Sequence, residues 1–207
     1  MAPRFSRSSL ACMVIALLVL LTACGSGGDD VPDDQAIKPA STPSGWDRTD
    51  LKAVTVAAPP EWEKGATKAA TETMDVTTWR HAASGGTSDS GMEVRVISKP
   101  QQKAAKAAKA LAISAMAGLE ASKVEPKKIT WPGAETAYLL SYMATLGQDD
   151  QKQKFLTRTF VLDLADGQQV QVTALAIEGS SDAKLPEHVL STVKLTGGEN
   201  PPAGGGY

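Results

Sequence analysis

The chain has 207 residues, a formal net charge of −2, 42% hydrophobic residues and 21% charged residues. These values are ordinary for a globular protein and exclude a wholly disordered chain. They also argue against a nucleic-acid partner, because the one basic cluster, Lys103, Lys106 and Lys109, lies among alanines without aromatic neighbours.

The chain begins with the features of an export signal. Arg4 and Arg7 give it a positive start, and the apolar run 10–21 is long enough for a signal but short for a bilayer span. The run ends in Leu21-Thr22-Ala23-Cys24. Residues 1–23 are therefore predicted to be a signal peptide, and a single-pass transmembrane helix is the less favoured alternative.

The end of this signal resembles the bacterial lipobox, in which a branched apolar residue and two small residues precede a cysteine. The resemblance implies cleavage before Cys24, a thioether from its sulfur to a diacylglyceryl group, and further acylation with chains such as palmitate. Two or three chains hold a protein durably, because each buried methylene contributes about 0.8 kcal/mol. We therefore expect a lipoprotein on the extracytoplasmic face of the cell membrane, with a charge that falls from −2 to −4 as Arg4 and Arg7 leave. The alternative is an ordinary cleaved signal in which Cys24 is incidental.

Composition divides the rest of the chain into three parts. Residues 24–45 are rich in Gly, Ser, Pro and Asp, which is typical of a disordered tether. Residues 46–196 are long enough for a single globular domain with its own core. The tail, residues 197–207, has the Gly and Pro content of a disordered end. With Cys12 in the signal and Cys24 acylated, no cysteine pair remains for a disulfide.

Hydrophobic periodicity predicts strands and two helices within the domain. A hairpin precedes a long helix with a buried stripe of alanines and leucines, and a three-strand antiparallel meander follows it. The predicted elements are a strand at 53–56, the hairpin 74–80 and 92–97, the helix 101–122, a strand at 128–131, the meander 135–146, 153–165 and 168–177, and a closing helix at 185–192. The predicted fold class is α/β in the broad sense (α+β), a mainly antiparallel β-sheet of about six strands covered by helices.

Both faces of the predicted meander are apolar. Leu140 and Tyr142 point one way from their strand, whereas Leu139 and Met143 point the other way. Because an apolar face has to be covered, helices or loops are expected on both sides of the sheet.

Several sequence features of the domain follow one another in an order that can be compared with known families. They are Gly45-Trp46 before the first strand, Pro59-Pro60-Glu61-Trp62 after it, the alanine-rich helix, the meander, and Val189-Leu190-Ser191-Thr192-Val193 at the close. In these features residues 46–196 resemble the LpqN-type actinobacterial lipoproteins and, more distantly, the Mog1/PsbP-like sandwich. The resemblance implies an α/β/α fold and an accessory or binding role. It carries over no functional residue, because it rests on element order and not on a reactive motif.

The sequence offers few residues for chemistry. His81 and His188 are too few and too far apart for a zinc site, and no cofactor-binding motif occurs. A hydrolase would need Ser141 or Ser191 together with His188, and neither serine lies in a nucleophile elbow.

Three tryptophans are the candidates for partner contact. Trp62, Trp79 and Trp131 lie near strand ends or turns, where indole rings can anchor a partner or line a ligand groove. The competing interpretation is that these rings plug the edges of the sheet. The lysine cluster named above is a weaker candidate for contact with anionic lipid, because a basic helix face is usually just solvated.

These observations favour a non-catalytic accessory module that binds an envelope protein or an amphiphile, with Cys24 setting its location. Two alternatives stay open. One is an envelope hydrolase whose site is assembled by tertiary contacts, and the other is a lipid carrier with a cavity between the sheet and the long helix.

Overall fold

The computed structural model of the chain describes residues 37–82, 88–121, 123–147, 152–179 and 184–196. The predicted signal 1–23, the predicted acylation site Cys24 and the predicted tail 197–207 lie outside these ranges, and the statements about them stay predictions.

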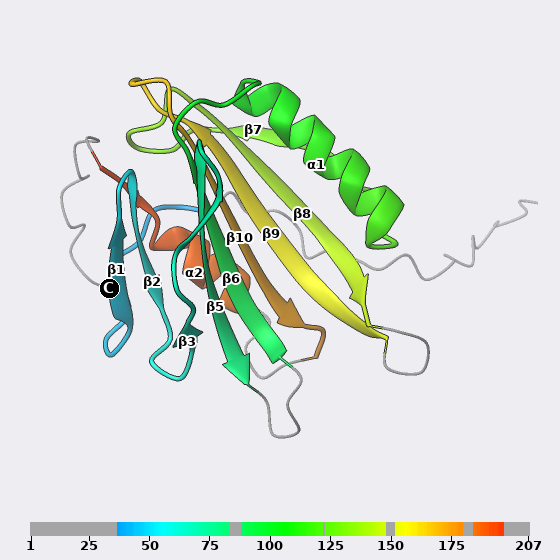
Figure 1. The fold of residues 1–207 in the computed structure, drawn as a ribbon. Helices are drawn as coiled ribbons and strands as arrows, with labels where there is room; N and C mark the ends of the chain where they lie inside the picture. The colour runs from blue at the N-terminus through cyan, green and yellow to red at the C-terminus, as the bar shows by residue number, and fades with distance from the viewer. Residues whose placement is uncertain (1–36, 83–87, 122, 148–151, 180–183, 197–207) are drawn as a thin grey trace, which may run out of the picture.

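Eight antiparallel strands form the main sheet of the described domain (Figure 1). Their order across the sheet is β3-β5-β6-β10-β9-β8-β7, and β4 also pairs with β5. The strands are β3 (Glu63–Lys64), β4 (Lys68–Thr71), β5 (Met74–Ala82), β6 (Ser88–Ile97), β7 (Lys127–Ile129), β8 (Thr136–Leu146), β9 (Gln153–Asp163) and β10 (Gln169–Ile177). The hairpin β5–β6 and the meander β8–β9–β10 confirm the two central sequence predictions.

The turn between β9 and β10 shows how local chemistry sets the register of the meander. Gly167 has a φ of 85°, a left-handed conformation that costs glycine little, and its N–H donates to the Leu164 carbonyl at 3.0 Å. The Asp166 carboxylate accepts the Gln168 N–H at 3.0 Å. The turn places Val172 opposite Phe160, so the apolar residues of the two strands share one face.

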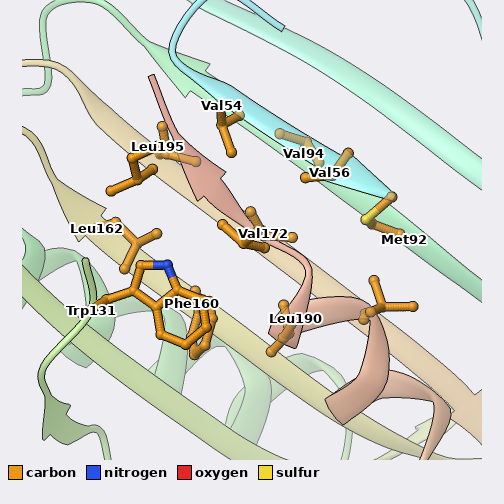
Figure 2. Packing of buried hydrophobic residues seen from close by; sticks show 14 of the residues in the cluster. Val54, Val56, Met92, Val94, Trp131, Phe160, Leu162, Val172, Leu190 and Leu195 are labelled. Atoms are coloured by element: carbon orange, nitrogen blue, oxygen red, sulfur yellow. The ribbon is translucent and has the colours of Figure 1, made fainter. Parts of the chain in front are cut away.

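A second, smaller sheet and a short helix cover one face of the main sheet. This layer consists of β1 (Asp47–Leu51), β2 (Val54–Ala58), β11 (Lys194–Leu195) and α2 (Leu185–Ser191). Figure 2 shows its apolar side chains, among them Val54, Leu190 and Leu195, meeting residues of the main sheet. At the centre, the rings of Trp131 and Phe160 lie 4.5 Å apart between centroids at a tilted angle, a favourable aromatic arrangement.

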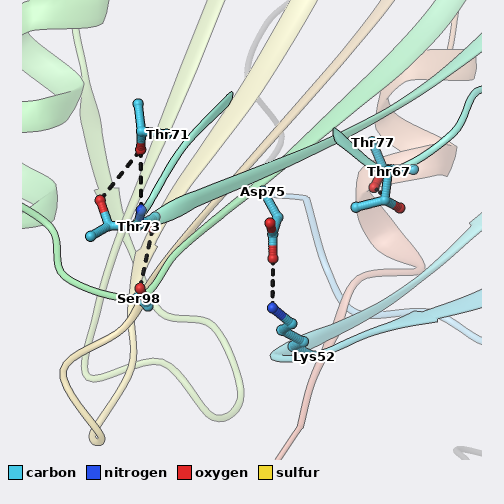
Figure 3. A network of polar contacts seen from close by, with 7 residues as sticks. All are labelled: Lys52, Thr67, Thr71, Thr73, Asp75, Thr77 and Ser98. Carbon is cyan, nitrogen blue, oxygen red and sulfur yellow. Dashed lines mark hydrogen bonds and ion pairs between the residues drawn. The ribbon is translucent and has the colours of Figure 1, made fainter. Parts of the chain in front are cut away.

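Polar contacts at the rim support this packing. Figure 3 shows Lys52, in the turn between β1 and β2, reaching Asp75 of β5 with its ammonium 2.7 Å from the carboxylate. The hydroxyls of Thr67 and Thr77 lie 2.8 Å apart at the same edge of the main sheet. The first contact joins the two sheets directly, although its exposure limits its contribution to stability.

Helix α1 (Ala104–Gly118) packs on the other face of the main sheet, over β8 and β9 (Figure 1). Its inward side is made of alanines, which allow a close approach to the sheet. They are Ala104, Ala107, Ala108, Ala112 and Ala115. Leu111 and Leu119 of the predicted stripe are partly buried against the same cluster, which confirms the predicted buried face.

The α+β class is confirmed. As expected, β8 and β9 are covered on both faces, whereas β10 is fully buried only on the face toward α2. Leu140 lies in the cluster under α1, whereas Leu139 lies in the cluster with the small sheet. The predicted strand number was too low, because β1, β3, β4 and β11 are too short or too polar to show a strand pattern. The sequence also placed helices or loops on both faces, whereas one cover is largely a sheet.

The chain makes contacts with the domain before residue 46, within the segment 24–45 predicted as a tether. Ile37 packs against the core cluster beside the small sheet, and the Ala40 N–H donates to the Ser191 carbonyl at 2.9 Å. Residues at the start of the described chain, Ile37 and Ala40, therefore already contact the domain on the α2 side of the main sheet.

Candidate functional site

On the α1 side of the main sheet, the described helices cover β8 and β9 but not β5, β6 and β10. α1 packs on β8 and β9, and side chains of β5, β6 and β10 on this side are half-buried or exposed, whereas their neighbours on the opposite side are buried. We call this surface the uncovered face. It consists of Val76, Thr78, Arg80, Glu93, Arg95, Ile97, Gln171, Thr173, Leu175 and Ile177.

The uncovered face mixes polar and apolar side chains across its strands. The register places Thr173 of β10 beside Glu93 of β6, and Glu93 beside Thr78 of β5, which gives a polar row. Glu93 also forms an ion pair with Arg95 at 2.6 Å, with both side chains more than a third exposed. Leu175 and Ile177 lie on one side of this row. The surface therefore offers hydrogen-bond donors, acceptors and aliphatic contact together.

The border between the uncovered face and α1 is formed by Tyr142 and Thr159. The Thr159 hydroxyl lies 3.1 Å from that of Thr173, which continues the polar row under the edge of the helix. Burial raises the pKa of the Tyr142 phenol above its usual value of 10.0, and a hydrogen bond with Thr159 opposes part of that rise. Tyr142 is therefore held as a neutral phenol at the edge of this surface.

A chain of side-chain amides connects the uncovered face with the start of α1. Lys103 at the helix N-cap makes no side-chain cap, and the buried Asp163 of β9 accepts the Ala104 N–H at 2.9 Å instead. Gln169 donates to the other Asp163 oxygen at 2.9 Å, and Gln171 donates to Gln169 at 2.9 Å. A carboxylate is favourable at a helix N-terminus. This contact fixes where α1 begins and how much of the sheet it covers.

A buried ion pair holds α2 on the opposite face. Arg158 of β9 is 1% exposed, and its guanidinium donates to Glu187 of α2 at 2.8 Å and to the Ser141 hydroxyl. A charge buried this deeply is tolerated only when it is paired. Ser141, a predicted hydrolase candidate, is therefore part of the attachment of α2.

The structure does not assemble the predicted nucleophile and base from Ser191 and His188. The Ser191 hydroxyl donates to the backbone carbonyl of His188 at 2.7 Å, which is a contact within the last turn of α2. A hydroxyl used in this way is not aligned with the imidazole for proton transfer.

Another serine, histidine and aspartate do meet, and sequence reasoning missed them. His81 Nδ1 lies 2.7 Å from Asp89 Oδ1, and the Ser90 hydroxyl donates to the same oxygen at 3.0 Å. In a serine hydrolase the imidazole accepts the proton of the hydroxyl, whereas here the carboxylate accepts it. The pairing of His81 with Ser90 across β5 and β6 was the available signal, but it required the hairpin register.

The three tryptophans predicted as partner contacts lie in the core, so that prediction is wrong for the described surface. Trp62, Trp79 and Trp131 are 6%, 3% and 2% exposed. The competing interpretation, that they fill the sheet packing, fits their position. Indole rings at strand ends looked available because sequence alone cannot show that β2, β11 and α2 fold over them.

Two further observations concern the described residues only. In these ranges no three side chains of His, Cys, Asp or Glu lie close enough together to bind a metal ion. None of the helices there combines the length and apolar character needed to span a bilayer.

Comparisons with known proteins give low similarity. No family model and no curated protein matches the chain. Among solved structures, the chain is similar to LpqN of Mycobacterium tuberculosis, described as involved in cell envelope biogenesis, with a TM-score of 0.45, 11% identity, and coverage of 77% of this chain and 90% of that one. It is also similar to a Pseudomonas aeruginosa protein of unknown function, with a TM-score of 0.41, 14% identity, and coverage of 68% and 89%. A third structure, from Bacteroides thetaiotaomicron, has a TM-score of 0.38 and 8% identity, with coverage of 69% of this chain and 45% of its own.

LpqN gives its name to the family that the sequence resembles. Likenesses at these TM-scores carry no information on ligand or activity, and membership of that family stays a prediction.

The buried ion pair yields a stability prediction. Glu187→Gln should lower the free energy of unfolding by about 2–4 kcal/mol, because Arg158 then stays buried with a weaker partner. Urea unfolding of the full chain measures this. Asp75→Asn, which breaks the exposed pair with Lys52, is the matched control and should cost less than about 1 kcal/mol. Equal losses in the two variants would contradict the assignment.

The phenol of Tyr142 yields a pH prediction. A pKa raised in the folded state means that the unfolded chain loses this proton first, near 10.0. The resulting stability is fully present below that pH and is lost as the pH rises through the folded-state pKa. Unfolding free energies measured above and below pH 10 should therefore fall less steeply for Tyr142→Phe than for the wild type. An identical alkaline slope in both proteins would rule out this role of burial.

Proposed function

We propose that this chain is an extracytoplasmic lipoprotein of the cell membrane, anchored through Cys24, whose domain is a non-catalytic recognition module for an envelope protein. The observation that supports the recognition role is the uncovered face. Among the described elements, no helix packs over the β5, β6 and β10 part of this sheet face, whereas the opposite face is closely packed. The anchor is supported by the sequence of the first 24 residues.

The character of the uncovered face favours a protein over a small molecule. Non-obligate protein interfaces combine apolar area with hydrogen-bonding groups in proportions near those of ordinary surface. The side chains around Thr173 have this mixture. The ion pair of Glu93 and Arg95 supplies charges of both signs to set the register of a partner.

An amphiphile remains the second occupant of interest, because Leu175 and Ile177 beside a hydroxyl row would also suit one. A carrier, however, needs a cavity between the sheet and the long helix. Alanines of α1 contact the sheet directly there, with Ala104 and Ala108 fully buried. This close approach supports a binding surface more than an internal lipid site.

Catalysis is not part of the proposal. The group of His81, Asp89 and Ser90 is the arrangement closest to a hydrolase site in the described residues, and its hydroxyl is bonded to the carboxylate. If the protein were a hydrolase of that kind, a fluorophosphonate would label Ser90.

The anchor gives a direct prediction. The chain produced in a bacterium with lipoprotein processing should have an intact mass that corresponds to a mature protein starting at Cys24 with a diacylglyceryl group and further acyl chains. Cys24→Ala should abolish the modification, whereas Cys12→Ala, within the signal, should leave it unchanged. A mature chain that begins elsewhere, or an unmodified Cys24, would refute the anchor.

The recognition surface gives a second prediction. A photo-crosslinking residue at Thr173 of the anchored chain should give discrete protein adducts in its own cells, and Leu175→Arg should reduce them about 30-fold, the effect of a central contact worth about 2 kcal/mol. The control position is Ala70, exposed on the edge strand β4. Equal adducts from both positions, or adducts that Leu175→Arg leaves intact, would count against this surface.

A further inference from the structure

The outward side of α1 carries the exposed large apolar residues of the described domain. Ile113 is 64% exposed and Met116 is 42% exposed, and the other large hydrophobic residues in the described ranges are buried or half-buried. Both belong to one stripe at helical spacing on the side opposite the buried alanines. We call this the outward stripe, and it consists of Lys106, Lys109, Ala110, Ile113, Met116 and Ala117.

The charge of the same helix is entirely positive. Lys106 and Lys109 are exposed on the outward stripe, Lys103 is exposed at the N-cap, and residues 104–118 include no acidic side chain. Lysines thus occupy the first half of the helix, and Ile113 with Met116 occupies the second half. Amphipathic helices that lie in a membrane interface combine basic and apolar residues, with the lysine stems extending along apolar surface.

The geometry points to docking of the outward stripe of α1 on an anionic phospholipid bilayer. The area argues against a stable protein contact, because such interfaces bury about 800 Å² on each partner from 20 or more residues, and the stripe has far fewer. A bilayer needs no such area. Each lysine near an anionic leaflet favours the docked state about fivefold, and the apolar pair adds to it.

The length of the segment before the domain is sufficient for this orientation. The described chain begins at Ile37 on the α2 side, which is the far side of the main sheet from α1. From Cys24 to Ile37 the chain can extend to about 45 Å. The three layers of the domain are about 30 Å thick, with a helix about 10 Å across and packed sheets about 10 Å apart. This argument from chain length rests on the proposed anchor at Cys24. The arguments from the charge and exposure of α1 are independent of the anchor.

The test uses the full chain with Cys12→Ser, reconstituted in vesicles of phosphatidylcholine with or without phosphatidylglycerol. An environment-sensitive fluorophore is placed at Ala110→Cys on the outward stripe, and the control position is Asp47→Cys, exposed on β1 in the opposite layer. The expected result is a blue shift at position 110 only with phosphatidylglycerol, and no shift at position 47. The substitutions Lys106→Glu and Lys109→Glu together should lower the docked-to-undocked ratio by about 25-fold or more, whereas arginines at both positions should preserve it.

A shift that ignores the anionic lipid, that is equal at positions 110 and 47, or that survives the two glutamates would overturn the inference. So would a shift that appears only when another protein is added. Intact mass of the unlabelled chain reports acylation of Cys24 separately. If that modification is absent, co-sedimentation of the same variants with the two kinds of vesicle gives the same comparison, so failure of the anchor and failure of docking are distinguishable.

Discussion

The structure depends on one constraint, which is that strand β9 is buried on both sides. Every residue of β9 from Phe155 to Asp163 is buried. A strand of this kind cannot face water on either side, so the sheet needs two covers. The two covers differ in kind: a single alanine-lined helix lies on one side, and a small sheet with a short helix lies on the other.

Two of the buried polar side chains, Asp163 and Arg158, help to hold these covers in place. The Asp163 carboxylate accepts the first N–H of α1, and the Arg158 guanidinium donates to the Glu187 carboxylate of α2. Both residues belong to β9, and their side chains point to opposite faces of the sheet. Each is charged and buried, so each is tolerated only while its partner is in place. The same strand therefore provides both the apolar surfaces that need covers and the contacts that determine where the covers begin. The uncovered face exists because α1 starts at Asp163 and extends over β8 and β9, not over β10.

Sequence patterns within single elements were sufficient to predict the strands of the meander, one of its turns and the buried side of the long helix. The alternation in β8 and β9 gave the correct faces, Asp166-Gly167 gave the correct turn, and the alanine stripe gave the correct side of α1. The small sheet was not predictable, because β11 has two residues and becomes a strand only by pairing with β2, far away in the chain. Because the small sheet was not predicted, the burial of the three tryptophans beneath this layer was not predicted either. The uncovered face could not be predicted either, because Thr173 and Glu93 become neighbours only through the register of β10 with β6.

Helix α1 has a geometric consequence for any molecule that approaches the domain near a membrane. The helix and the uncovered face lie on the same side of the main sheet (Figure 1). If the helix rests on lipid headgroups, it acts as a spacer that holds the neighbouring strands about one helix diameter, roughly 10 Å, above them. Only a single polypeptide segment close to the membrane, or a lipid headgroup, fits into that gap. The choice of partner would then be set by clearance as much as by side-chain chemistry.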